Sequence, residues 1–260
     1  MSLRPVRSHP ELLTLTDGDP WVCWAIDLRS LPPAWYDPEV GLVALVRTRR
    51  GAGSSWVLLP QSSAAPERAL AASGPILQRL PGSHVTVSRE VGAAAVAVVP
   101  TWGQGVGWDW MWTTSSPPPV PWEDRVVTLD TTDPAVAAQL IRLLQEHSPR
   151  HSARPGDERV VGWVGVRRGT RLIACAAWFL QVPAVPLLAS VAVHPTARRR
   201  GLGAAVTAAL TRRALTSGSP AVTVDLYADN DDARRIYRRL GFVTARRFIS
   251  WPMRPPAARR

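Results

Sequence analysis

The second half of the chain alternates apolar runs of strand length with amphipathic stretches of helix length. Apolar runs predict six strands, over residues 126–129, 160–167, 172–180, 187–193, 221–227 and 242–251. Helical spacing of apolar residues predicts helices over 135–146, 201–216 and 230–240. The order β-α-β-β-β-α-β-α-β is typical of an α/β fold with a mixed, mostly antiparallel sheet flanked by helices.

Local signals set the ends of these elements. Asp133 and Pro134 give the first helix an N-cap followed by proline at the first helical position. Gly218 and Gly241 stop the two later helices, because glycine readily adopts the left-handed conformation that ends a helix. The short segment 168–170 joins two apolar runs and predicts a β-hairpin.

The first half is less regular and rich in tryptophan. We predict strands over 21–26, 41–47, 55–59, 85–87, 93–99 and 106–113, and helices over 66–72 and 76–80. In the strand 106–113 large apolar side chains occupy every second position, which is typical of one buried face. We favour packing in the core and between domains as the role of the tryptophans; an aromatic wall for a ligand is the alternative.

A proline-rich segment separates the two halves. Residues 117–121 include four prolines, which can continue neither a helix nor a central strand. We therefore predict a Trp-rich, β-rich N-terminal domain over 1–115, a linker over 116–122 and a second α/β domain over 123–260. The length of 260 residues agrees with two domains of ordinary size.

The most informative chemical pattern follows the predicted strand 187–193. His194 and Pro195 end this strand, three consecutive arginines follow, and Gly201-Leu202-Gly203 opens a long helix. The first turn of a helix has unpaired N–H groups and a positive dipole end, which together attract phosphates. Glycine lets an anion approach the backbone, and guanidinium groups can cover its outer side. The pattern predicts a phosphate-binding turn; close helix–strand packing is the other explanation of the glycines.

Two motifs in this half carry a family resemblance. The sequence RRRGLG at 198–203 fits the Arg/Gln-x-x-Gly-x-Gly/Ala signature of the GNAT superfamily of acyl-CoA-dependent N-acyltransferases. The segment 230–242, NDDARRIYRRLGF, is similar to that family's closing helix. Both motifs occur in the family's order, so about residues 124–251 resemble a GNAT domain. The first half shows neither motif and could be a degenerate second copy.

The resemblance implies how acetyl-CoA would bind as cosubstrate. The phosphate turn would hold its pyrophosphate, and the strand edge 190–193 would pair with the amide arm as a short strand. A backbone N–H of that strand would polarise the thioester carbonyl. The implied cofactor-binding residues are Val191, Val193, Arg198, Arg199, Arg200, Gly201, Leu202, Gly203, Ala204, Asn230 and Ala233.

Tyr237 is the residue to which the resemblance assigns catalysis. It would protonate the departing CoA thiolate, which a phenol can do because it is an uncharged donor at neutral pH. Asn230, Ala233 and Tyr237 are spaced by three and then four residues, so they share one helix face. A core tyrosine and an N-capping asparagine are the alternative interpretations of Tyr237 and Asn230.

The sequence does not single out a general base. Many members of the family carry glutamate on the strand before the phosphate turn, whereas this chain has Ser190, Ala192 and His194 there. Residues that could take a proton through water are Glu146, His147, His151 and Asp225. Each of these is equally well explained as a solvated or ion-paired side chain, and we interpret His194 as a turn residue.

Composition limits the partners and the location. The formal net charge is +11, but all 31 basic residues are arginine, which indicates compositional bias more than a nucleic-acid surface. The two cysteines are far apart without metal-ligand spacing, so we expect reduced thiols and no metal. No apolar run approaches the roughly 18 residues of a membrane span, and the first residues lack a secretory apolar region. We expect a cytoplasmic protein without membrane association.

These observations favour an N-acetyltransferase that moves an acetyl group from acetyl-CoA to an amine by direct attack in a ternary complex. The amine acceptor would be a small molecule or a peptide. A non-catalytic, acyl-CoA-binding regulatory module is the alternative, and nucleic-acid association through the arginines is a third. The sequence defines neither the acceptor, nor the acyl chain, nor the oligomeric state.

Overall fold

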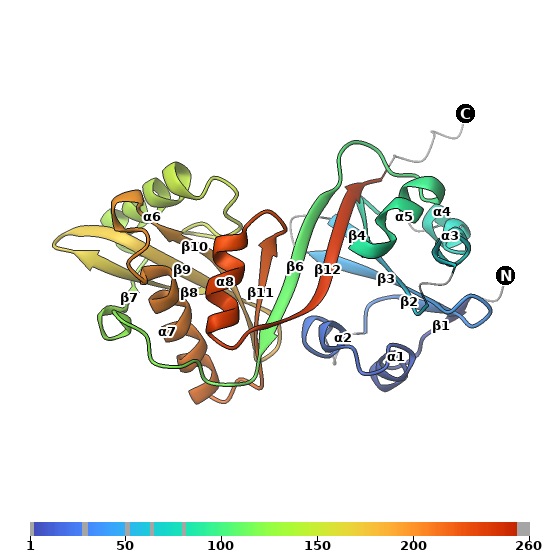
Figure 1. The fold of residues 1–260 in the computed structure, drawn as a ribbon, viewed down its shortest axis with the longest axis horizontal. Helices are drawn as coiled ribbons and strands as arrows, with labels where there is room; N and C mark the ends of the chain where they lie inside the picture. The colour runs from blue at the N-terminus through green and yellow to red at the C-terminus, as the bar shows by residue number, and fades with distance from the viewer. Residues whose placement is uncertain (1–2, 28–30, 50–52, 63–64, 80–81, 254–260) are drawn as a thin grey trace. The chain divides into compact units, whose positions relative to one another are not determined.

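The computed structural model describes residues 3–27, 31–49, 53–62, 65–79 and 82–253. The chain forms two compact units, and neither is continuous in sequence (Figure 1). The first unit comprises Met1–Asp109, Tyr227–Asp229 and Ala245–Arg260, and the second comprises Trp110–Leu226 and Asn230–Thr244. Two strands, β6 (Val106–Thr113) and β12 (Val243–Pro252), contribute residues to both units.

The first unit combines short helices with a mixed sheet. Its strands are β1 (Arg4–Pro5), β2 (Ala34–Asp37), β3 (Leu42–Arg49), β4 (Gly53–Pro60) and β5 (His84–Ser88). Its helices are α1 (His9–Leu15), α2 (Pro20–Ala25), α3 (Pro66–Ala71), α4 (Gly74–Arg79) and α5 (Gly92–Val98), with a 3-10 turn η1 (Arg89–Val91). Strands β1 to β4 pair antiparallel in sequence order, β4 and β5 are parallel, and β12 pairs antiparallel with β5.

The second unit has longer elements. Its strands are β7 (Val127–Leu129), β8 (Val160–Arg168), β9 (Arg171–Val182), β10 (Val185–Val193) and β11 (Val222–Tyr227). Its helices are α6 (Pro134–His147), α7 (Leu202–Thr216) and α8 (Asp231–Arg239), with 3-10 turns η2 (Glu123–Arg125) and η3 (Pro195–Ala197). Strands β7 to β10 pair antiparallel, β10 and β11 are parallel, and β6 follows β11 in the sheet order.

The two units repeat one connectivity. Each has four antiparallel strands, a helical crossover and a parallel fifth strand, as the pairings of β1–β5 and β7–β11 show. Each half of the chain then ends in a helix and a long strand, α5 with β6 and α8 with β12. These last strands are exchanged in part, because Trp110–Thr113 belongs to the second unit and Ala245–Pro252 to the first.

Helices cover both faces of the sheet in the second unit. Val164 packs in a cluster with residues of α7 and α8, whereas its neighbour Trp163 packs with residues of α6. This alternation follows from the strand geometry, which points successive side chains to opposite faces. In the chain as a whole Trp21, Trp56 and Trp110 are fully buried, so packing explains these three tryptophans.

All strands and helices predicted for the second half are present, with ends that differ by at most two residues. The hairpin is also confirmed: Arg168 pairs with Arg171 across a two-residue turn in which Gly169 has φ of 59°. In the first half, the strands over 41–47, 55–59, 85–87 and 106–113 are confirmed, as is the helix over 66–72. Helix α4 covers the prediction over 76–80 except residue 80, which lies outside the described residues.

The predicted strand over 21–26 is wrong, because most of this segment forms helix α2. The helix starts at Asp19, whose carboxylate accepts the backbone N–H groups of Trp21 at 2.7 Å and Val22 at 3.2 Å. Pro20 takes the first helical position, where its missing N–H costs nothing. The signal is the same Asp-Pro pair that marked the start of α6, but a short apolar run does not distinguish strand from helix.

The predicted strand over 93–99 is wrong for a related reason, since α5 occupies it. The segment is rich in alanine, the best helix former, and Val91, Ala94, Ala95 and Val99 are buried at helical spacing. The prediction of one buried face for β6 is also wrong: Asp109, Met111 and Thr113 are buried together with Trp110. Three elements without a prediction are β1, α1 and β2. Among the described helices, none combines the length and apolar character needed to span a bilayer.

The cap of α2 predicts a measurable loss of stability. Asp19 also pairs with Arg246, so Asp19→Ala removes two hydrogen bonds to backbone N–H groups and one ion pair. We expect this variant to lose about 1–2 kcal/mol of unfolding free energy in urea titrations. Asp19→Asn keeps the capping oxygen and loses only the charge, so it should lose clearly less. Equal losses in the two variants would contradict the role of the cap.

Candidate active site

The candidate site begins where β10 and β11 separate. The two strands are parallel, and they pair at Leu187↔Thr223 and Leu188↔Val224. On its other edge β10 remains paired with β9 as far as Val193. Among the described strand pairs, the edge of β10 beyond Leu188 that faces β11 therefore has no ladder partner. Such an edge can accept another extended chain.

A bulge marks the start of this edge. Ser190 has φ of 51°, in the left-handed region that non-glycine residues seldom adopt, and the pairing with β9 shifts between Ala189 and Ala192. A bulge turns the backbone groups that follow it. Val191 and Val193, the predicted binding positions, lie just after the bulge and are partly buried against the core.

The predicted phosphate turn has the backbone that it requires. Arg199 and Gly201 are both left-handed, with φ of 62° and 86°. Gly201 is the N-cap of α7, and its carbonyl accepts the first helical bond from Ala205 N–H at 2.9 Å. The N–H groups of residues 202–204 therefore precede the helical ladder and project from the helix end. This is the arrangement expected for anion binding.

The two glycines of the turn serve different needs. A Cβ on Gly201 would meet nothing within 4 Å, so its left-handed backbone rather than crowding requires glycine. A Cβ on Gly203 would meet Ile236 Cδ1 at 3.5 Å and Val193 Cγ2 at 3.7 Å, which are ordinary contacts. Close helix–strand packing therefore does not require glycine at position 203, and space for a ligand beside the backbone remains as a reason for it.

The three arginines of the turn are not equivalent. Arg198 donates to the carbonyl oxygens of Val193 at 3.2 Å and His147 at 3.4 Å, so it ties the turn to β10 and α6. Arg199 and Arg200 are exposed. The hydrogen bond from Arg235, with the charges of Arg235 and Arg199, holds the pKa of Asp232 below its usual value. Arg199 thus lies close enough to the first turn of α8 to act on its carboxylates.

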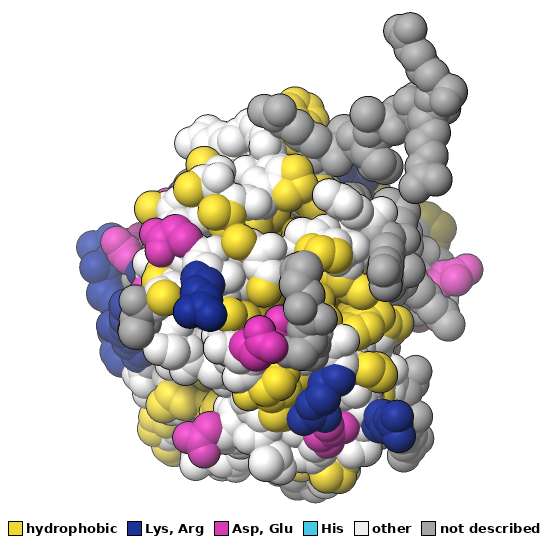
Figure 2. Space-filling view, turned by 90° about the vertical axis from the view of Figure 1, so that its right-hand side faces the viewer, with side chains coloured by type: hydrophobic (Ala, Val, Ile, Leu, Met, Phe, Trp, Pro, Cys, Tyr) yellow, Lys and Arg dark blue, Asp and Glu magenta, His cyan; other side chains and the backbone are white. Residues whose placement is uncertain are grey.

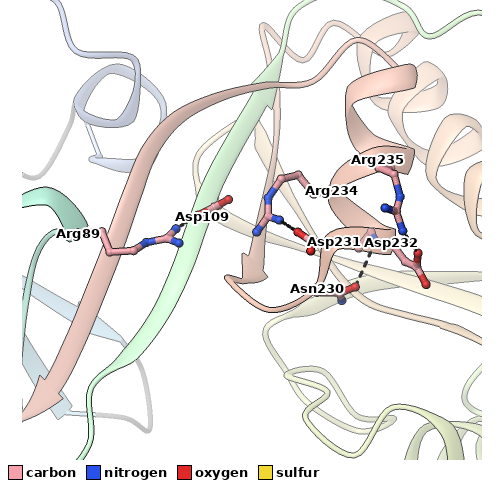
Figure 3. Close-up of polar contacts among 8 residues, drawn as sticks. Arg89, Asp109, Asn230, Asp231, Asp232, Arg234 and Arg235 are labelled. Atoms are coloured by element: carbon pink, nitrogen blue, oxygen red, sulfur yellow. Dashed lines mark hydrogen bonds and ion pairs between the residues drawn. The ribbon is translucent and has the colours of Figure 1, made fainter.

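Helix α8 starts with a network of polar side chains (Figure 3). Asn230 Oδ1 accepts the backbone N–H of Ala233 at 3.1 Å, which confirms that Asn230 caps the helix. Ion pairs join Arg234 to Asp231 and Arg235 to Asp232 over one helical turn. The acidic residues also suit the positive end of the helix dipole. A contact from Asn230 or Ala233 to a cofactor arm stays a prediction.

Tyr237 lies in the core beside this turn. Its side chain is buried, and its ring packs against Phe242 with centroids 5.7 Å apart. Burial raises the pKa of the Tyr237 phenol, so the hydroxyl keeps its proton at neutral pH. One hydrophobic cluster brings together predicted site residues from three elements: Val191, Val193, Leu202, Ala204, Ala233 and Tyr237.

His194 is a turn residue, as interpreted from the sequence. It is the N-cap of η3, and its Nδ1 lies 2.9 Å from Thr196 Oγ1. Arg171 donates to His194 Nε2 at 2.7 Å, and the ring packs edge-on to His147 at 4.7 Å between centroids. Desolvation and the charge of Arg171 lower the pKa of His194, which favours the neutral imidazole.

The four candidate bases occupy three places in the second unit: the end of α6, the loop after it, and β11. Glu146 and His147 lie at the end of α6, with 3.5 Å between carboxylate and imidazole. Asp225 follows Val224, the last residue of β11 that pairs with β10. His151 Nδ1 lies 2.8 Å from the carbonyl oxygen of Ser148, which can only accept a hydrogen bond. In the neutral imidazole the proton therefore lies on Nδ1, and Nε2 carries the lone pair.

Cysteine chemistry does not suit this site. Cys175 is fully buried in β9, and its Sγ lies 3.7 Å from the carbonyl oxygen of Ser190. Burial raises the pKa of the Cys175 thiol to about 12, so the nucleophilic thiolate is scarce at neutral pH. Within the part of the chain that the structure describes, no three His, Cys, Asp or Glu side chains form a group that could hold a metal.

Comparisons with known proteins agree with this geometry. The family described as FR47-like protein, which is GNAT-related, matches residues 163–249. The mycothiol acetyltransferase of Mycolicibacterium smegmatis is 31% identical over 136 residues. The resemblance to the GNAT superfamily is confirmed. The aligned region covers 51% of this chain and 39% of that relative, so the chain spans about two fifths of its length.

Solved structures of GNAT proteins share the fold along most of the chain. A GCN5-related N-acetyltransferase from Kribbella flavida is 20% identical and has a TM-score of 0.51, covering 84% of this chain and 88% of its own. A GNAT-family acetyltransferase from Colwellia psychrerythraea is 12% identical with a TM-score of 0.53, covering 98% and 100%. At these identities the likeness concerns the fold alone.

Proposed function

We propose that this protein is an N-acetyltransferase that uses acetyl-CoA to acetylate an amine-bearing small molecule or peptide. The proposal is carried by one observation: the unpartnered edge of β10 runs directly into a turn whose N–H groups project from the start of α7. This geometry suits a ligand with an extended amide arm and a diphosphate. The GNAT relationship supports the same activity.

The residues present fit acetyl-CoA, which supplies an acyl group activated as a thioester. The N–H groups of Leu202, Gly203 and Ala204 would hold the pyrophosphate, and Arg199 and Arg200 would cover it from outside. Each charge at a helix end contributes about 0.3–1 kcal/mol. Backbone groups of Val191 and Val193 would hydrogen-bond the amide arm, because this edge of β10 has no strand partner among the described residues.

Tyr237 would supply the proton that the departing thiolate needs. It lies in one hydrophobic cluster with the binding strand and the phosphate turn, and its hydroxyl is an uncharged hydrogen-bond donor. A phenol that is neutral at the operating pH is a competent general acid for a thiolate.

We propose His151 as the general base. Its Nδ1 proton is directed to Ser148 O, so the imidazole is held in the tautomer that leaves Nε2 free to take a proton from an amine. Of the other candidates, Glu146 and His147 lie at the end of α6, where the His147 ring packs against His194. Asp225 lies on β11.

Transfer would be direct, without a covalent acyl-enzyme. Cys175 is protonated and buried, and burial also raises the pKa of Cys23. Positioning two substrates can account for about 7–11 kcal/mol of a barrier in favourable cases. Both cysteines are free thiols, which fits a reducing compartment, so we propose that the protein acts in the cytoplasm.

Two alternatives remain distinguishable from this proposal. A non-catalytic acyl-CoA-binding module would bind coenzyme A without releasing free thiol in the presence of amines. Nucleic-acid binding is not favoured, because on the face shown in Figure 2 apolar and acidic side chains separate the dark blue basic ones, except at the left edge, where several lie together. A continuous basic surface is the usual footprint of nucleic-acid binding.

A methyl group at position 203 tests the phosphate turn. Gly203→Ala has room in the protein and improves helix propensity, so we expect unfolding by heat to be unchanged or shifted upward. Calorimetric titration with coenzyme A should show affinity weakened by about tenfold or more, because the methyl group occupies the space of the ligand. Gly201→Ala should instead lower stability through its left-handed backbone. Wild-type affinity in Gly203→Ala would reject the phosphate turn.

Removal of one hydroxyl tests the general acid. Tyr237→Phe keeps the packed ring, so folding and coenzyme A affinity should hardly change. We expect kcat in a free-thiol release assay to fall by about 100-fold or more, the usual contribution of general acid catalysis. Tyr36→Phe in β2 is the matched control and should have wild-type turnover. Undiminished turnover in Tyr237→Phe removes this residue from the mechanism.

The base is tested by a pair of histidine variants. His151→Gln should lower kcat by about 100-fold, because the group that takes the proton of the amine is gone. Coenzyme A affinity should stay as in the wild type. His147→Gln serves as the control and should leave turnover within about threefold. If His147→Gln lowered kcat more than His151→Gln, the general base would be His147.

A further inference from the structure

The side chain of Ser190 joins the bulge of β10 to a distant loop. The backbone N–H of Ala153 donates to Ser190 Oγ at 2.8 Å, and Ser190 Oγ in turn lies 3.3 Å from the carbonyl oxygen of Ala153. The two residues are 37 positions apart in sequence. One hydroxyl thus pairs with both backbone groups of a single loop residue, in the manner of a strand partner.

The loop concerned, residues 148–159, has no helix or strand of its own. Two contacts within the loop shape its ends, and one contact anchors its middle to β10. His151 bonds to Ser148 O near its start, and Asp157 forms a bidentate pair with Arg159 near its end, at 2.9 Å and 2.6 Å. Between them, the fully buried Ala153 packs in the cluster that includes Trp163 and residues of β10. The bond to Ser190 fixes this middle point to the border of the candidate site.

A hydroxyl is well suited to this position, whereas a carboxylate is not. Serine can donate and accept at once, so it satisfies both the N–H and the carbonyl of Ala153. An ionised glutamate could only accept and would face the carbonyl oxygen with negative charge. The left-handed backbone of Ser190 directs the side chain toward the loop at the point where β10 leaves β11.

We propose that Ser190 is a positioning residue, which fastens the loop 148–159 at the edge of the acyl site so that the amine acceptor meets a preformed surface. The acceptor part of this proposal rests on the proposed N-acetyltransferase function. The fastening itself rests on the two hydrogen bonds and on the burial of Ala153.

Limited proteolysis tests the fastening without any substrate. The Arg150–His151 bond is a trypsin site in the exposed part of the loop, and Arg154 is followed by proline and resists cleavage. Ser190→Ala loses both hydrogen bonds and should be cut after Arg150 at least about tenfold faster than the wild type. Ser190→Thr keeps a hydroxyl and should restore protection. Ser152→Ala, an exposed serine of the same loop, is the matched control and should behave as the wild type.

Kinetics test the positioning role. With the primary amine that gives the highest turnover in a free-thiol assay, Ser190→Ala should raise the KM for the amine about fivefold to tenfold. The KM for acetyl-CoA should stay within about twofold, and Ser190→Thr should recover the wild-type value. A general loss of folding would lower the apparent kcat, leave both KM values unchanged and increase trypsin cleavage at many sites. Ser190→Gly, which relieves the backbone strain, then replaces Ser190→Ala.

The outcomes separate the two proposals. Wild-type protection after Arg150 in both Ser190→Ala and Ser190→Gly overturns the fastening. Faster cleavage with an unchanged KM for the amine overturns the positioning role. Absence of turnover by the wild-type protein with every amine overturns the proposed function, and the trypsin result still decides whether Ser190 holds the loop.

Discussion

The end of pairing between β10 and β11 is the constraint on which the candidate site depends. A sheet normally saturates both edges of a central strand, and a saturated edge cannot take up an extended ligand. Here the bulge at Ser190 follows the last pair, Leu188↔Val224, and the freed edge continues directly into the turn before α7. One backbone irregularity therefore aligns an open strand edge with the N–H groups of a helix end.

The first unit provides an internal comparison, because it has the same connectivity without these features. Strands β4 and β5 remain paired at four positions, from Ser55↔His84 to Leu58↔Val87. The residues that follow β4, Gln61 to Ala65, contain neither arginine nor glycine. In the described part of the second unit only two such pairs are made, β10 continues for five residues beyond them, and a basic turn follows.

The strands and helices of the second unit could be predicted from the sequence, because its periodicity, its helix caps and its helix-ending glycines all agree. The prediction failed at α2, because the apolar run 21–26 indicated a strand, whereas the Asp19-Pro20 cap before it indicated the helix that forms. Motif spacing was sufficient to group Tyr237 with the strand and the turn. The bond from Ser190 to Ala153 could not be predicted, because it depends on a left-handed backbone and on two segments brought together only by folding.

The first unit has a structural role that requires no ligand, because the two units exchange parts of their last strands. Trp110–Thr113 follows β11 in the sheet order of the second unit, and Ala245–Pro252 pairs with β5 in the first. A chain divided at the proline-rich segment would leave each fragment with a bare sheet edge, open to aggregation. Each half of the chain thus supplies the strand that completes the sheet of the other unit, so a cut in the proline-rich segment would cost both units a strand.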